Sequence, residues 1–190
     1  MVGFAHSTRR RLAAGLCLVV ASLAPARAVD EYELKGAFLY NFAKFVHWPP
    51  EAFETSGDQI VLCLLDDPSR GALERSVSGK TAQDKVFSVR NVSGADELAG
   101  CHILFVGASS PSHGSKLLDR ARDHHVLTVG ESDRFALLGG VIGVFMEGSR
   151  VRFEVNADAA ERAGLQISSQ LLELATHVIA APTGEDEAEP

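Results

Sequence analysis

The chain has 190 residues, of which 46% are hydrophobic and 23% are charged, and its 25 acidic and 18 basic side chains give a net charge of −7. This length is typical of one ordinary domain with a sizeable core. An acidic chain argues against a nucleic-acid-binding protein, because phosphate groups would repel it at long range.

The first 28 residues have the three parts of a secretory signal peptide. Three arginines at 9–11 precede an apolar run at 12–23, and Ala26-Arg27-Ala28 forms the small-x-small pattern that signal peptidase accepts. The apolar run is shorter than the roughly 20 residues that span a bilayer as a helix. The sequence therefore favours export over the alternative, a retained membrane anchor.

Cleavage after Ala28 would leave 14 basic and 25 acidic side chains, a net charge of −11. No internal repeat or long linker divides the remaining sequence. We expect one domain over residues 29–180 and a disordered acidic tail over residues 181–190.

A helix is predicted over residues 30–47, where apolar side chains recur at helical spacing. Trp48-Pro49-Pro50 ends it, because proline disfavours helix in the preceding residue and has no backbone N–H to donate. The helix face is more aromatic than one short domain needs. Part of it is therefore a candidate partner surface, formed by Phe38, Phe42, Phe45 and Trp48.

A continuous apolar run at 60–65 predicts a strand covered on both faces. Mainly apolar runs at 101–106 and 126–129 predict two more strands, and an alternating run at 85–92 predicts a fourth. Short helical segments are predicted between the strands, at 70–77, 95–99, 116–123 and 133–138. Strands that alternate with helices are typical of an α/β sandwich with a mostly parallel sheet.

The pattern changes near residue 140. Residues 140–146 and 150–155 predict a late β-hairpin with glycine in its turn, and Asn156 or Asp158 can cap the next helical segment. The region 147–174 is a second candidate partner surface, because hairpin tips and helix faces project readily. A last helix is predicted from the apolar stripe of Ile167, Leu171, Leu174 and Val178.

Catalytic clusters are not evident in the sequence. Asp66-Asp67 follows a strand, as in phosphoacceptor receiver domains, but the later central strand ends without the acid that such domains need. Ser109 and Ser110 do not fit the G-x-S-x-G elbow. They are expected in a plain loop, although the carboxyl end of a strand can line a ligand crevice. We expect a protein that is not an enzyme and needs no cofactor.

The histidines predict no metal site. His124 and His125 are adjacent, so they point apart in any regular element and cannot chelate together. A single histidine beside apolar residues is more often packed in the core than bound to a metal. Four further histidines each stand alone in the sequence: His47, His102, His113 and His177.

Two cysteines would remain after cleavage, Cys63 and Cys101. An even pair in an oxidising compartment favours a disulfide. Two cysteines in strands also pack well as buried free thiols. The residues alone leave both alternatives open.

Four segments, in order, resemble the YfiR/HmsC-like family. They are ELKGAFLYNFAKFVHWP at 33–49, CHILFVGAS at 101–109, LTVGESDRFALLGGVIGVF at 127–145 and VRFEVNADAAERAGLQISSQLLELA at 151–175. The resemblance extends over roughly residues 31–178, nearly the whole of the expected domain.

This resemblance implies a Rossmann-like α/β sandwich, commonly a homodimer, that acts in the periplasm without chemistry of its own. Such proteins repress an inner-membrane diguanylate cyclase through its periplasmic domain and so lower cyclic di-GMP and biofilm formation. An outer-membrane lipoprotein can sequester the repressor. The family's cysteine pair falls at Cys63 and Cys101, which implies a disulfide, whereas a second pair found in some relatives has no counterpart here.

We therefore expect a repressor that binds the inhibited cyclase conformation more tightly than the active one. The alternative is a periplasmic sensor that binds a small molecule and acts on another membrane receptor. A hydrolase would need a polar cluster that the sequence does not show.

Overall fold

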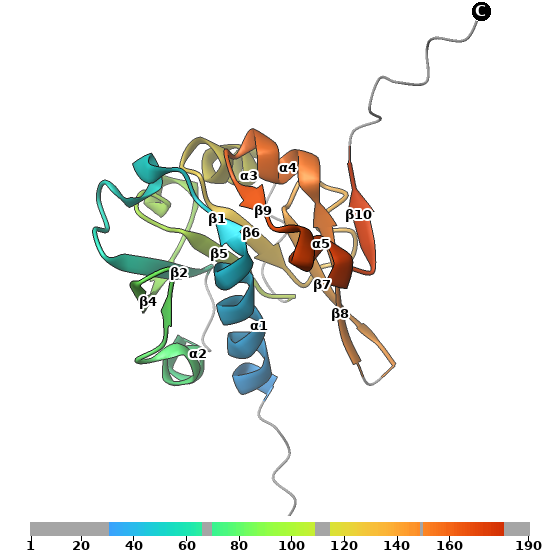
Figure 1. Cartoon of the computed structure of the whole chain (residues 1–190), viewed down its shortest axis with the longest axis horizontal. Coiled ribbons are helices and arrows are strands. Elements are labelled where there is room, and N and C mark those ends of the chain that lie inside the picture. Colours follow the sequence, from blue (N-terminus) through green and yellow to red (C-terminus); the bar gives the residue numbers. More distant parts are fainter. Residues whose placement is uncertain (1–30, 66–69, 109–114, 149, 181–190) are drawn as a thin grey trace, which may run out of the picture.

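The computed structural model describes residues 31–65, 70–108, 115–148 and 150–180. Within these ranges an eight-stranded sheet has the order β10-β8-β7-β6-β5-β2-β4-β3, and helices pack on it (Figure 1). A separate two-stranded sheet pairs β1 with β9. The strands are β1 (Val46–His47), β2 (Gln59–Leu65), β3 (Thr81–Ala82), β4 (Lys85–Val92), β5 (Ile103–Val106), β6 (Leu127–Gly130), β7 (Ile142–Glu147), β8 (Arg150–Asn156), β9 (Gln166–Ile167) and β10 (His177–Ile179).

Most neighbouring strands of the large sheet run parallel. The parallel pairs are β10–β8, β2–β4, β2–β5, β5–β6 and β6–β7, whereas β7–β8 and β3–β4 are antiparallel. The predicted α/β sandwich with a mostly parallel sheet and a late hairpin is confirmed. The helices are α1 (Glu31–Phe45), α2 (Arg70–Val77), α3 (Ser115–Asp123), α4 (Ala157–Arg162) and α5 (Ser169–Leu174), with 3-10 turns η1 (Pro50–Phe53) and η2 (Ala95–Glu97).

Two hydrophobic cores lie on the two faces of the sheet. Successive side chains of a strand point to opposite faces, so Ile60, Leu62 and Leu64 of β2 enter one core while Cys63 and Leu65 enter the other. The larger core also contains buried residues of α1, α2, α4 and α5, and the smaller one contains buried residues of α3. The continuous apolar sequence of β2 is therefore explained, because one of the two cores covers each of its faces.

A disulfide joins Cys63 in β2 to Cys101 just before β5. Both cysteines are buried in the smaller core. The bridge ties two neighbouring parallel strands at the centre of the sheet, so of the two alternatives that the residues left open, the structure contains the disulfide.

Helix α1 ends two residues earlier than predicted. Val46 and His47 pair with Ile167 and Gln166 of β9, which draws them out of the helix. The amide of Gln83 donates hydrogen bonds to the carbonyls of Ala43 (2.7 Å) and Val46 (2.6 Å), so carbonyls at this helix end keep partners.

The predicted helix over residues 133–138 is wrong. Turns occupy residues 133–139, where Arg134 has a φ of 62° and Gly139 a φ of 103°. These angles lie outside the right-handed helical region. The turns place the ring of Phe135 against Gly130 and Gly140, and a Cβ at either glycine would overlap that ring.

The predicted last helix is confirmed only over Ser169–Leu174 (α5), because the residues before and after it belong to β9 and β10. Ala175 is extended, with φ −69° and ψ 142°, and the next N–H donates to the carbonyl of Phe153 at 2.8 Å. The chain then pairs in parallel with β8. Of the predicted stripe Leu171 is buried, whereas Leu174 and Val178 are exposed by 67% and 45%.

Candidate functional site

A cleft of about 580 Å³ lies between α1, the carboxyl ends of β5 and β6, and the β7–β8 hairpin. Its volume is within the range of about 300–1,000 Å³ that small-molecule sites usually have. Most of its lining is apolar, from Leu34, Phe38, Leu39, Phe42, Phe105, Val129, Val144, Phe145, Met146 and Val151.

The topology explains why the cleft is there. Ala108 follows β5 by two residues, and Glu131 follows β6 directly. β5 and β6 are parallel neighbours, with Val106 opposite Gly130, so both residues emerge at the same edge. Open α/β sheets bind ligands outside the carboxyl ends of their strands.

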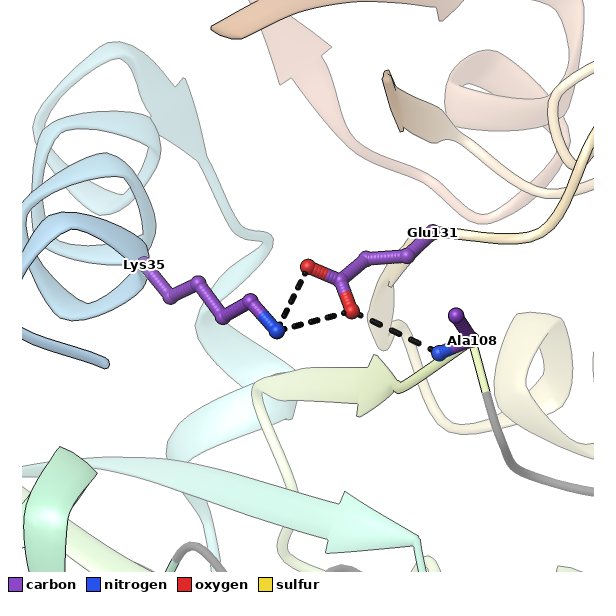
Figure 2. Close-up of polar contacts among 3 residues, drawn as sticks. All are labelled: Lys35, Ala108 and Glu131. Carbon is purple, nitrogen blue, oxygen red and sulfur yellow. Dashed lines mark hydrogen bonds and ion pairs between the residues drawn. The ribbon is translucent and has the colours of Figure 1, made fainter. Parts of the chain in front are cut away.

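An ion pair lies among these apolar side chains (Figure 2). The ammonium of Lys35, which comes from α1, is 3.0 Å from each carboxylate oxygen of Glu131. The N–H of Ala108 also donates to this carboxylate, at 3.4 Å. The side chains of Lys35 and Glu131 are only 20% and 16% exposed. The pair therefore connects α1 to the strand edge and places opposite charges in a mainly apolar cleft.

His102 belongs to the core rather than to the cleft. Its Nδ1 accepts from the N–H of Val61 at 3.0 Å, its Nε2 is 3.2 Å from the hydroxyl of Ser56, and its ring stacks on Phe53 at 4.5 Å. Burial lowers the pKa of His102 to about 4, against the opposing effect of a backbone hydrogen bond with Ala52. The ring is thus a neutral packing residue at ordinary pH.

The four aromatic residues predicted to face a partner differ in how deeply they are buried. Phe42 and Trp48 are buried, and Phe38 and Phe45 are partly buried against the larger core. Phe38 and Phe42 also line the cleft. A partner surface on this face stays a prediction.

Of the other candidate residues named from the sequence, the histidines that the structure describes do not line the cleft. His125 contacts the carbonyl of Ala163 through Nδ1 at 2.8 Å, and the side chains of His47 and His177 are exposed. In the part of the chain that the structure describes, no group of three histidine, cysteine, aspartate or glutamate side chains is arranged to hold a metal. The remaining candidates lie outside the described residues: Asp66, Asp67, Ser109, Ser110 and His113.

The sequence interpretation missed the ion pair. Lys35 and Glu131 are 96 positions apart, and in the sequence each resembles an ordinary surface charge. One signal was present, because Glu131 follows the apolar run that forms a buried strand, and such strand ends are common ligand positions.

Comparison with known proteins identifies the family. A family model described as YfiR/HmsC-like matches residues 32–176. Among solved structures, a conserved domain protein from Vibrio cholerae is similar, with a TM-score of 0.50 and 9% identity over 78% of this chain and 60% of that one. Another is the ABC domain in complex with L-Trp from Streptococcus pneumonia, with a TM-score of 0.44 and 12% identity over 66% of this chain and 58% of that one.

The likeness to the Vibrio protein shows the fold alone, and the chain spans 60% of that protein's length. The family match is more informative, because it extends over most of the described domain and includes α1, the cleft and the late hairpin. The chain therefore belongs to the YfiR/HmsC-like family, a regulatory, non-catalytic family associated with periplasmic regulation of diguanylate cyclases.

Proposed function

We propose that this chain represses an inner-membrane diguanylate cyclase by binding its periplasmic domain, which lowers cyclic di-GMP and biofilm formation. The observation that carries the proposal is the family match over residues 32–176. Binding represses only if the chain has a higher affinity for the inhibited cyclase than for the active one. A shift from 1:99 to 99:1 needs a preference of about 10⁴-fold.

The proposed location is the periplasm, reached through a signal peptide at residues 1–28. The composition of that segment supports it. Separately, none of the helices in the described ranges has the length and apolar character of a membrane-spanning segment. The mature chain would begin at Val29, and the intact mass of protein from a periplasmic extract measures this directly. A chain that keeps Met1 in the membrane fraction would contradict the location.

We place the cyclase-binding surface on the late part of the fold. β7, β8 and β10 are neighbours, with α5 preceding β10 in the chain. They carry three exposed apolar side chains, Met146, Leu174 and Val178. Exposed apolar groups gain most from burial by a partner, so this surface is favoured over the largely buried aromatic residues of α1.

Leu174→Asp tests this surface, with Leu138→Asp as its matched control. Both leucines are about two-thirds exposed, at 67% and 68%, so both changes should affect folding equally little. We expect Leu174→Asp to weaken binding to the purified cyclase domain about tenfold or more, and Leu138→Asp to leave it unchanged. Equal effects would place the binding surface elsewhere.

Gene deletion tests the function itself. Cyclic di-GMP should rise when the gene is deleted, and the rise should vanish when the cognate cyclase is deleted as well. An unchanged cyclic di-GMP level, or a purified protein that binds no periplasmic cyclase domain, would contradict repression. The same purified protein should form a homodimer in equilibrium sedimentation, and an outer-membrane lipoprotein should compete with the cyclase for it.

A further inference from the structure

We infer that the cleft beside α1 is a binding site for a small amphiphile, one with an apolar body and a polar head that bears no net charge. The inference does not depend on repression of a cyclase, because it concerns a ligand of the purified chain. It follows from the volume of the cleft, its apolar lining and the ion pair within it.

The apolar body is indicated by the lining. Four phenylalanine rings, those of Phe38, Phe42, Phe105 and Phe145, contribute to the cleft together with aliphatic side chains from α1, β6, β7 and β8. Phe42 and Phe105 lie deep and are buried, whereas Leu34 and Met146 are exposed. The part of this apolar lining that water reaches is stabilised when a ligand covers it. A ligand without such a body would leave this surface in water.

The head is indicated by the ion pair. Lys35 and Glu131 neutralise each other at 3.0 Å, and both are largely buried. A head with a net charge would have to compete with one of these two groups for the other, and separating opposite charges in a poorly solvated cleft is costly. An uncharged head such as an amide or a hydroxyl can approach the pair and form hydrogen bonds without separating it.

Titration with N-phenyl-1-naphthylamine, an uncharged fluorophore that brightens in apolar surroundings, measures occupancy of the cleft in the mature chain. We expect saturable binding of one probe per chain. Octanamide, octanoate and octylamine share an eight-carbon chain and differ in the charge of the head at pH 7.5. Octanamide should displace the probe at a concentration about tenfold lower than either charged compound.

Charge variants test the role of the ion pair more specifically. Lys35→Met leaves the Glu131 carboxylate without its ammonium partner, so octylamine should become the strongest competitor. Glu131→Gln removes the negative charge of Glu131 beside the Lys35 ammonium, so octanoate should become the strongest competitor. A purely structural role for the pair would weaken all three compounds alike and would not change their order.

Steric variants test the location. Val144→Trp fills the cleft from β7, whereas Val86→Trp places the same side chain on β4, where Val86 is 48% exposed and does not line the cleft. The first should reduce probe affinity at least tenfold and the second should not. Met146→Trp, at a 63% exposed position of the lining, is the alternative if circular dichroism shows that Val144→Trp is unfolded.

Three results would overturn the inference. One is probe binding that does not saturate, and another is equal loss of binding in the two tryptophan variants. The third is an order of competitors that neither Lys35→Met nor Glu131→Gln changes. A cleft that takes no probe but controls self-association, so that Val144→Trp converts a dimer to a monomer, would instead assign this face to a second copy of the chain.

Discussion

Removal of the disulfide should cost a calculable part of the stability. Cys63 and Cys101 are 38 positions apart, and closure of a loop of that size stabilises the folded state by about 4 kcal/mol in the chain-entropy model. We expect the double variant Cys63→Ala/Cys101→Ala to lose about this amount. With a typical urea dependence of about 2 kcal/mol per M, the unfolding midpoint should fall by about 2 M.

The single alanine variants separate the bridge from the packing of its sulfur atoms. Each single change already breaks the bridge, so each should lower the urea midpoint nearly as far as the double change, and the effects should not add. Reductant should destabilise the wild-type chain by a similar amount and leave the double variant unchanged. A midpoint shift below about 0.5 M, or additive single effects, would show that loop closure is not the main contribution.

Three further predictions concern side chains of the core. Because the pKa of His102 is lowered to about 4 in the folded chain and its ordinary value is about 6.5, the unfolded state binds the proton first. This residue should therefore remove about 3 kcal/mol of stability as the pH falls from 6.5 to 4. Urea midpoints across that range should vary less in His102→Gln, and an equal slope would contradict the assignment. The side-chain oxygen of Asn156 caps α4 by accepting from the N–H of Ala159, and its side-chain N–H donates to the buried carbonyl of Ala136, both at 2.8 Å. Asn156→Ala should therefore cost about 2–3 kcal/mol of stability. In thermal unfolding this loss should exceed that of Ser168→Ala, since Ser168 only caps α5. Equal losses would show that the hydrogen bond from Asn156 to the carbonyl of Ala136 contributes nothing to stability. Gly140→Ala should cost about 2 kcal/mol or more, because the new methyl group would overlap the Phe135 ring. A second change, Phe135→Leu, should recover part of that loss in the same measurement, and no recovery would mean that the strain lies elsewhere.

The strands of the central sheet were predictable because their burial is nearly complete. β2 and β5 have side chains in both cores, and only a strand covered on both faces needs a short continuous apolar run. The late hairpin was also predictable, because Gly148 has the positive φ of 60° that its turn requires. In these elements the local pattern and the tertiary environment agree.

The last residues were not predictable in this way. The spacing of Leu171, Leu174 and Val178 fits a helix, but a parallel partner for β10 is available only after β8 has joined the sheet. Tertiary pairing then outweighs a weak local helical preference. The ion pair of the cleft was missed for the same reason, because only the folded sheet places Glu131 opposite α1.

The two ends of the described domain are closely interlaced. Val46 pairs with Ile167, the carbonyl of Phe45 accepts from the N–H of Ser168 at 2.9 Å, and the ring of Phe42 packs edge-on against Phe153 at 5.2 Å. Helix α1 packs early against α2, whereas the partners of its C-terminal end in β8 and β9 lie more than a hundred positions later in the chain. Such distant closure is slow relative to local structure. In the nascent chain the end of α1 therefore keeps part of its apolar surface uncovered until the last third of the sequence is available.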